Sequence, residues 1–322
     1  MDIPIISEQP ALAGDDVLDD VIRWHDQGLR TVMVTLVGID GATPRPLGAQ
    51  MAVSEDGRWV GYLSGGCLEK TVALEALRVL AEGPCIVRYG RGSPYFDIRL
   101  PCGSGLDLSF NPVDPTFIEE CRDLRRVRSA FVQTLDLAGG AMRVSRASGI
   151  PQSRRDGDLF QRAHTPRLRF QLVGGGPALS AVAVLSNAFG VELDIMTPDD
   201  VVRLDLVRAG LPARGMAEPA AQGLAQLDGY TAAVVTFHDH SWEVPVLAQL
   251  LKSNCFYIGV LGSRQAQLDR LAKLSEMGVA PGEIARMRNP AGLIPRAKSR
   301  GTLAVSILAE IVTEAKSLGL LA

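Results

Sequence analysis

Two cysteines lie in glycine-rich segments where the backbone can change their chemistry. Cys67 follows Ser64, Gly65 and Gly66 and precedes a helical pattern. Its sulfur would lie among the unpaired N–H groups at the positive end of a helix, which lower the pKa of a thiol. Lys70, one turn further along, adds a cation that favours the thiolate. Cys67 is therefore a candidate for a reactive thiol or a soft-metal ligand.

Cys102 lies in a second segment of this kind, PCGSG at 101–105. Its glycines leave backbone N–H groups uncovered, and such groups can form a concave site for an anion. Each of the two cysteines falls on a predicted loop, and loops carry many ligand-binding groups. The remaining cysteines fall in or beside predicted helices and strands, so we expect them in the core: Cys85, Cys121 and Cys255.

Composition leaves several interpretations of the two loop thiols open. They could be inert, as free cysteines commonly are. A cysteine hydrolase would need a histidine base, and no sequence signature links either thiol to His25, His164, His238 or His240. A zinc site would need further ligands at regular spacing, and the five cysteines contain no C-x-x-C pair.

The overall composition is that of a soluble globular protein. The 322 residues are 47% hydrophobic and 21% charged, long enough for two domains. No stretch approaches the roughly 18 uncharged apolar residues of a membrane helix, and the N-terminus lacks the basic start and apolar run of a secretory signal. With a net charge of -3 there is no broad basic surface. We expect a cytoplasmic protein with neither nucleic acid nor a membrane span.

Hydrophobic periodicity divides the chain into two domains of different type. Residues 1–148 mix predicted helices (15–27, 67–80, 117–126) with predicted strands and hairpins, which indicates a mixed α/β domain. Residues 149–166 are rich in Ser, Arg, Asp, Gly and Pro without periodicity and are predicted to be a linker. From 167 to 322 strands alternate with helices, which predicts a Rossmann-like, doubly wound parallel sheet.

A glycine-rich turn follows the first predicted strand of the second domain. Gly174, Gly175 and Gly176 occupy the position of a dinucleotide fingerprint, but Leu179 stands at its third glycine. The place of the ribose-binding acid holds Thr197. A helix N-terminus can still hold a phosphate. Two hypotheses stay open: a site for NAD(P) or another nucleotide, as in an NAD(P)-dependent oxidoreductase, or a tight turn without a ligand.

His238, Asp239 and His240 follow another predicted strand. Residues two apart on a strand share a face, so both imidazoles could meet one metal ion. A loop at the carboxyl edge of such a sheet is a plausible functional position. No third ligand is evident, which favours the other interpretation, hydrogen-bonded loop residues that order the edge of the sheet.

Separate segments of the chain, in order, resemble one known family, the XdhC/CoxI accessory factors of xanthine dehydrogenases and related molybdenum hydroxylases. The segments are GATPR at 41–45, GYLSGGCLE at 61–69, LPCG at 100–103, GGGP at 174–177, HDH at 238–240, GVLGSR at 259–264, NPAGL at 289–293 and AVSILAE at 304–310. They cover nearly the whole length. The resemblance implies an XdhC-type cofactor-binding domain followed by a Rossmann-like domain.

The function that the resemblance implies is that of a chaperone rather than an enzyme. Such a protein binds the molybdenum cofactor, as molybdopterin or its cytosine dinucleotide form, and shelters it from oxidation. It supports sulfuration of the cofactor by a cysteine desulfurase and inserts the cofactor into an apo molybdenum hydroxylase resembling xanthine dehydrogenase. The resemblance also implies a homodimer.

The resemblance assigns the metal-facing positions to the two cysteine segments. Cys67 and Cys102 match the family's cysteine motifs and would face molybdenum, with Gly65, Gly66 and Gly103 beside them. The cofactor also carries a phosphate, and this anion needs a positive neighbour. We therefore expect two cations to bind it: Arg45 and Lys70.

Three residues depart from the family pattern. Pro177 stands where the family's glycine turn usually has a histidine, and Thr197 replaces the usual acid after the second strand. Both changes weaken the prediction of a nucleotide site. Ser104 replaces a second consecutive glycine, a change that should keep the turn open.

Overall fold

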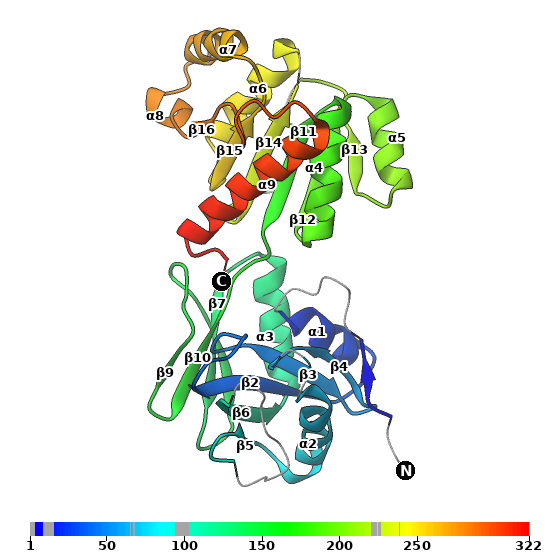
Figure 1. Cartoon of the computed structure of the whole chain (residues 1–322), viewed down its shortest axis with the longest axis vertical. Helices are drawn as coiled ribbons and strands as arrows, with labels where there is room; N and C mark the ends of the chain where they lie inside the picture. Colours follow the sequence, from blue (N-terminus) through cyan, green and yellow to red (C-terminus); the bar gives the residue numbers. More distant parts are fainter. Residues whose placement is uncertain are drawn as a thin grey trace. The chain divides into compact units, whose positions relative to one another are not determined.

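The computed structural model describes residues 4–8, 16–64, 66, 68–93, 103–219, 224, 227–237 and 239–321. They form two compact units, residues 1–166 and 167–322 (Figure 1). Among the described helices, none is long and apolar enough to cross a lipid bilayer. In the described residues the first unit contains two sheets and the second contains one, and each unit has its own hydrophobic cores.

The first unit is built on a six-stranded mixed sheet, called sheet A. Its strands lie in the order β1 (Ile6–Ser7), β4 (Arg58–Gly61), β3 (Gln50–Ser54), β2 (Thr31–Asp40), β6 (Gly105–Pro112) and β5 (Cys85–Gly90). Only the β1–β4 pair is parallel among these strand pairs; the others are antiparallel. Strands β3 and β4 form a hairpin around Asp56.

Helices cover both faces of sheet A: α1 (Leu18–Asp26), α2 (Glu69–Glu82) and α3 (Pro115–Arg126). Val32, Val34 and Leu36 of β2 pack in the core that contains the apolar residues of α2. Met33 packs in the opposite core, with residues of α1 and α3. A strand buried on both faces reads as a continuous apolar run rather than an alternating one, which is the pattern of β2.

The predicted linker at 149–166 is wrong, because these residues contain two strands. They belong to sheet B, an antiparallel sheet of the first unit in the order β8 (Met142–Arg146), β7 (Phe131–Asp136), β10 (Leu159–His164) and β9 (Arg154–Asp156). On β10 the buried positions alternate as Phe160, Arg162 and His164. Two of these three inward residues are polar, so the strand has no apolar alternation to detect.

The second unit is a parallel α/β fold, as the sequence predicts. Sheet C has the order β13 (Ala213–Gly215), β12 (Glu192–Thr197), β11 (Arg169–Gly174), β14 (Thr231–Thr236), β15 (Tyr257–Val260) and β16 (Met287–Arg288), with every pair parallel. Its helices are α4 (Gly176–Phe189), α5 (Asp200–Arg208), α6 (His240–Leu251), α7 (Arg264–Glu276), α8 (Pro281–Ile284) and α9 (Arg300–Ser317).

These helices lie on both faces of sheet C. Residues of α4, α5 and α9 share one core with the sheet, and α4 and α9 lie side by side (Figure 1). Residues of α6 and α7 share the other core. Because the chain builds outward from β11 in one direction and then from β14 in the other, the strand order reverses between these two strands. Ligands of doubly wound sheets bind at the carboxyl ends of the strands beside such a reversal.

Candidate functional site

Both predicted cysteine turns are attached to the same side of sheet A. Strands β2 and β4 run toward this side, and β6 starts from it, since Asp40 pairs with Gly105 and Met51 with Gly61. Cys67 and Cys102 themselves, with Gly65, lie outside the described residues. The strands that carry the two turns, β4 and β6, are separated by β3 and β2, a lateral separation of about 14 Å at ordinary strand spacing. Along the sheet, Gly61 lies level with Val34 of β2 and Gly105 level with Asp40.

The turn that precedes α2 is organised by a residue that the sequence reasoning missed. Glu69 is the first residue of α2 and is 1% exposed. Its Oε1 accepts hydrogen bonds from the backbone N–H groups of Leu63 (3.0 Å) and Ser64 (2.8 Å). Its Oε2 accepts from those of Gly66 (2.9 Å) and Leu68 (3.1 Å). The Ser64 hydroxyl lies 3.1 and 3.0 Å from the two oxygens.

This arrangement corrects the expectation that the turn offers unpaired N–H groups to Cys67 or to an anion. Four of the loop N–H groups already bind the Glu69 carboxylate. Burial alone would raise the pKa of Glu69, but the hydrogen bonds from Ser64 and Leu63 outweigh it and hold the pKa below its usual range. The predicted helix start at Cys67 is also two residues early. The sequence carries no capping-box signal for this role, because Ser64 and Glu69 are five residues apart rather than the three of that motif.

The second turn lies against the loop that follows β2. Ser104 is 1% exposed, and its hydroxyl donates to the carbonyl of Ala42. The backbone N–H of Arg91 donates to the Ser104 carbonyl at 2.8 Å. A Cβ on Gly41 would lie 3.4 Å from Ser104 Cα. Ser104, which replaces the family's glycine, therefore links the PCGSG segment to the GATPR segment, which contains Arg45.

An ion-pair cluster, also missed from the sequence, supports this turn. Arg88 binds Asp107 at 2.9 Å and Asp40 at 3.2 Å, and Arg91 binds Asp40 at 2.6 Å. These residues come from the ends of three adjacent strands. Gly105 fits beside them because any Cβ there would lie 2.6 Å from the Arg88 guanidinium. Charged residues at the ends of otherwise apolar strands were the sequence signal.

Each of the two turns contains a described glycine with a positive φ. Gly66 has φ +114° and Gly103 has φ +66°, a backbone region that favours glycine. No described atom lies within 4 Å of a Cβ built on either residue. Both positions therefore use the backbone freedom of glycine.

The two predicted phosphate-binding cations lie in different elements of the first unit. Arg45 is half-buried in the loop after β2, where its backbone N–H is 3.2 Å from the Thr43 hydroxyl. Lys70 is exposed in the first turn of α2. Their role in binding a phosphate stays a prediction.

In the second unit, the predicted glycine turn connects β11 to α4. Gly174 ends β11, Gly175 precedes the helix and Gly176 begins it. Gly174 has φ +142°, and a Cβ there would lie 2.7 Å from the carbonyl carbon of Thr236 on β14. The close approach of β14 therefore explains this glycine without a ligand.

At the end of β12, Thr197 stands at the position of a ribose-binding acid and offers no carboxylate to a nucleotide. Thr197 is 1% exposed, and its hydroxyl accepts from the backbone N–H of Asp199 at 3.1 Å. The Asp199 carboxylate caps α5 through the N–H groups of Val201 and Val202. Nucleotide binding at Gly174 to Gly176 stays a prediction.

The His238-Asp239-His240 segment follows β14, as predicted, and its described part leads directly into α6; His238 lies outside the described residues. Asp239 is the N-cap of α6 and accepts from Ser241 N at 2.8 Å, and His240 begins the helix. His240 Nδ1 lies 2.7 Å from Glu243, which also binds Arg270 at 2.7 Å. A metal ion at this segment stays untested.

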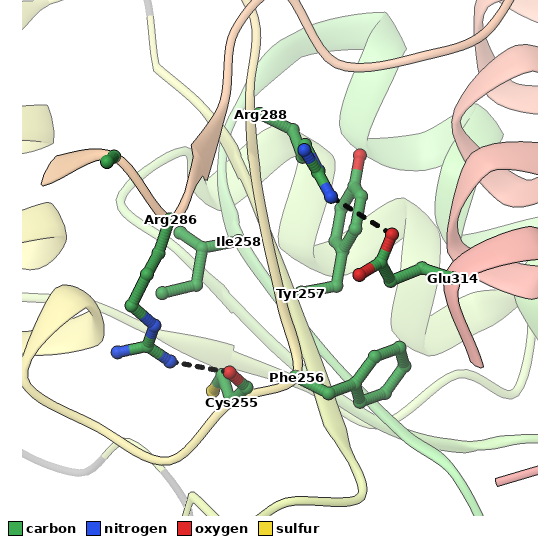
Figure 2. Close-up of a pocket in the computed structure, with 8 residues that line it drawn as sticks. Cys255, Phe256, Tyr257, Ile258, Arg286, Arg288 and Glu314 are labelled. Carbon is green, nitrogen blue, oxygen red and sulfur yellow. Dashed lines mark hydrogen bonds and ion pairs between the residues drawn. The ribbon is translucent and has the colours of Figure 1, made fainter. Parts of the chain in front are cut away.

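A hollow of about 190 Å³ lies at the start of β15 (Figure 2). The Arg286 guanidinium points to the carbonyl of Cys255 at 2.6 Å and also binds that of Leu251, while Arg288 pairs with Glu314 at 3.0 Å. Burial raises the pKa of the Cys255 thiol. These groups are engaged with the protein, and the hollow lies at the amino end of β15, away from the ligand-binding edge of such sheets.

The two-unit fold and the glycine-flanked cysteine segments define the class of protein. The chain belongs to the XdhC and CoxI family, which matches residues 24–90, and residues 170–311 match the XdhC Rossmann domain. The resemblance predicted from the sequence is thereby confirmed.

The relatives include a functionally named protein. The chain is 35% identical, over 95% of its length and 91% of the relative's, to the molybdenum cofactor insertion chaperone PaoD of Escherichia coli K12. It is 22% identical to a probable xanthine dehydrogenase subunit of Bacillus subtilis, over 93% of its length and 97% of the relative's. A crystal structure described as a xanthine dehydrogenase from Bacillus halodurans shares the fold, with TM-score 0.72, 20% identity, and 95% and 96% of the two chains covered.

Proposed function

We propose that this chain is a molybdenum cofactor insertion chaperone for an enzyme of the xanthine dehydrogenase type. The observation that carries the proposal is the attachment of both cysteine turns to one side of sheet A. The 35% identity to a protein named as such a chaperone supports it.

The side chains proposed to bind the cofactor on this side of sheet A have the chemistry that the cofactor requires. Thiolates are soft ligands that suit sulfur-bound metals, and Cys67 and Cys102 supply two of them. Lys70 and Arg45 supply cations for the phosphate. The cofactor is cargo in this proposal, and the chain's own residues bind it, orient it and keep water away from it.

Further parts of the proposal concern the partners, the oligomeric state and the cellular location of the protein. We infer that the chain supports sulfuration by a cysteine desulfurase, acts as a homodimer in the cytoplasm, and delivers its cargo to an apo molybdenum hydroxylase. Affinity purification without oxygen, followed by molybdenum and pterin analysis and identification of co-purifying proteins, tests each part. The pterin analysis also distinguishes molybdopterin from its cytosine dinucleotide form.

The alternative, an NAD(P)-dependent oxidoreductase, has less support. Gly174 is explained by the approach of β14, and the carboxylate of Asp199 is used as a helix cap. Titration with reduced nicotinamide tests it directly, because binding changes the fluorescence of the nicotinamide.

The chaperone proposal predicts that Cys67→Ala lowers bound molybdenum at least several-fold without unfolding the protein, because it removes a metal-facing thiol. Molybdenum and pterin content after anaerobic loading, with a thermal melt, measure this. Cys85→Ala, in strand β5, is the matched control and should keep wild-type occupancy. Normal occupancy in Cys67→Ala would count decisively against the proposal.

A further inference from the structure

The Glu69 carboxylate has an unusual set of partners for a buried charge. Its hydrogen bonds come from backbone N–H groups and one hydroxyl rather than from an arginine or lysine. An ionised carboxylate only accepts hydrogen bonds, so each oxygen needs donors. Oε1 is bound by Leu63 and Ser64, and Oε2 by Gly66 and Leu68. The carboxylate thus holds both halves of the turn.

The partners of Oε2 are the two residues that flank Cys67 in the chain. We propose that Glu69 is a positioning residue for Cys67: its carboxylate fixes the backbone on both sides of this cysteine before any cofactor arrives. This inference rests on the proposed function. A turn that is already ordered loses less conformational entropy when a ligand binds, which strengthens binding.

A second consequence concerns how the anionic part of the cofactor is bound. The N–H groups of Gly66 and Leu68 are occupied by Glu69, and the carboxylate adds a negative charge to the turn. These two N–H groups are therefore not available to a phosphate, and the carboxylate disfavours an anion beside them. We expect the first turn to contribute the thiol, and side-chain cations such as Arg45 or Lys70 to bind the phosphate.

Replacing Glu69 with glutamine keeps the shape of the side chain but removes one of its two hydrogen-bond-accepting oxygens. Its amide has one oxygen and one NH2 group. Whichever way the amide turns, an NH2 faces the N–H groups of one half of the turn, so two donors confront each other. Glu69→Gln therefore releases either the Leu63 side or the Gly66 side of the turn.

The test compares Glu69→Gln with Glu82→Gln, an exposed glutamate of the same helix. Cofactor affinity is measured by anaerobic titration, and amide hydrogen exchange is measured over residues 62–70 of the cofactor-free protein. We expect Glu69→Gln to bind the cofactor at least tenfold more weakly and to exchange faster in this segment. Glu82→Gln should match the wild type in both measurements.

Alkylation of the cofactor-free protein with iodoacetamide separates positioning from general destabilisation. The rate at Cys67 should rise several-fold in Glu69→Gln, while the rate at Cys85 stays unchanged, because only the turn is released. Equal increases at both cysteines would indicate global loosening and overturn the inference. Should Glu69→Gln fail to fold, Ser64→Ala removes one donor to the same carboxylate and should give a smaller change in the same direction.

The outcomes distinguish this inference from the function on which it rests. Wild-type affinity, exchange and alkylation in Glu69→Gln would overturn the positioning role, even if Cys67→Ala loses the cofactor. Full cofactor retention in Cys67→Ala would remove the proposed function, while hydrogen exchange would still decide whether Glu69 orders the turn.

Discussion

His164 is buried in the first unit as a neutral side chain within a polar network. It is 2% exposed and stacks on Phe131, with ring centroids 4.5 Å apart. Its Nδ1 lies 2.7 Å from the Arg162 guanidinium, which can only donate, and its Nε2 lies 3.0 Å from Gln133 Oε1. Burial, followed by the charges of Arg162 and Arg125, holds the pKa of His164 well below its usual range.

The depressed pKa of His164 predicts that the first unit loses stability as the pH falls. Below about pH 6.5 the unfolded chain binds a proton at this histidine, whereas the folded chain does not. The contribution is fully present above about pH 6.5 and falls by about 1.4 kcal/mol per pH unit below it. Urea unfolding of wild type and His164→Gln at pH 8.0, 6.5 and 5.5 measures the slope. The variant should show a flatter dependence, and parallel curves would contradict the prediction.

Polar residues on buried faces set the limit of what the sequence could predict. Strands β2, β11, β14 and β15 were predictable because their apolar runs match strands buried on both faces. Strand β10 was predicted to be linker because Arg162 and His164 face inward and interrupt the pattern. The candidate site was predicted as two cysteine segments, but Glu69 appeared as one more helix residue. Its partners are backbone groups, which leave no mark in side-chain spacing.

At the scale of elements, a buried ion pair joins α6 to α7. Glu243 and Arg270 are each 1% exposed and lie 2.7 Å apart. Arg270 also donates to the carbonyl of Leu261 at 2.8 Å, just after β15. The N-cap of α7, Ser263, is by contrast exposed. The pair therefore fixes α7 against α6 and the end of β15.

Glu243→Gln should destabilise the second unit by about 3–5 kcal/mol, because it leaves the Arg270 charge buried and uncompensated. Chemical denaturation followed by circular dichroism measures the loss. Asp205→Asn, in the exposed pair with Arg208, is the control and should change stability by less than about 1 kcal/mol. The double variant Glu243→Gln, Arg270→Met should recover part of the loss. A single variant as stable as wild type would mean that the pair is not an anchor.

At the scale of the whole chain, each unit contains its own hydrophobic cores, as an independent domain does. The cores of the first unit are built from residues of sheets A and B with α1 to α3. Those of the second unit are built from sheet C with its own helices. Both cysteine turns, Glu69 and the predicted cations belong to the first unit. We therefore propose a domain boundary at Pro166 rather than at residue 148, with cofactor binding located in the first domain.

This division predicts that residues 1–166 and 167–322, expressed separately, each fold and unfold cooperatively, because neither truncation cuts a core. The first fragment should retain molybdenum and pterin after anaerobic loading, and the second should retain neither. Cutting at residue 148 instead removes β9 and β10 and exposes Leu135, which packs with Phe160 of β10 in the full unit. That shorter fragment should therefore aggregate or melt at lower temperature than 1–166. Cofactor retention by the full chain alone would show that binding requires both domains, and the assignment to the first would have to be abandoned.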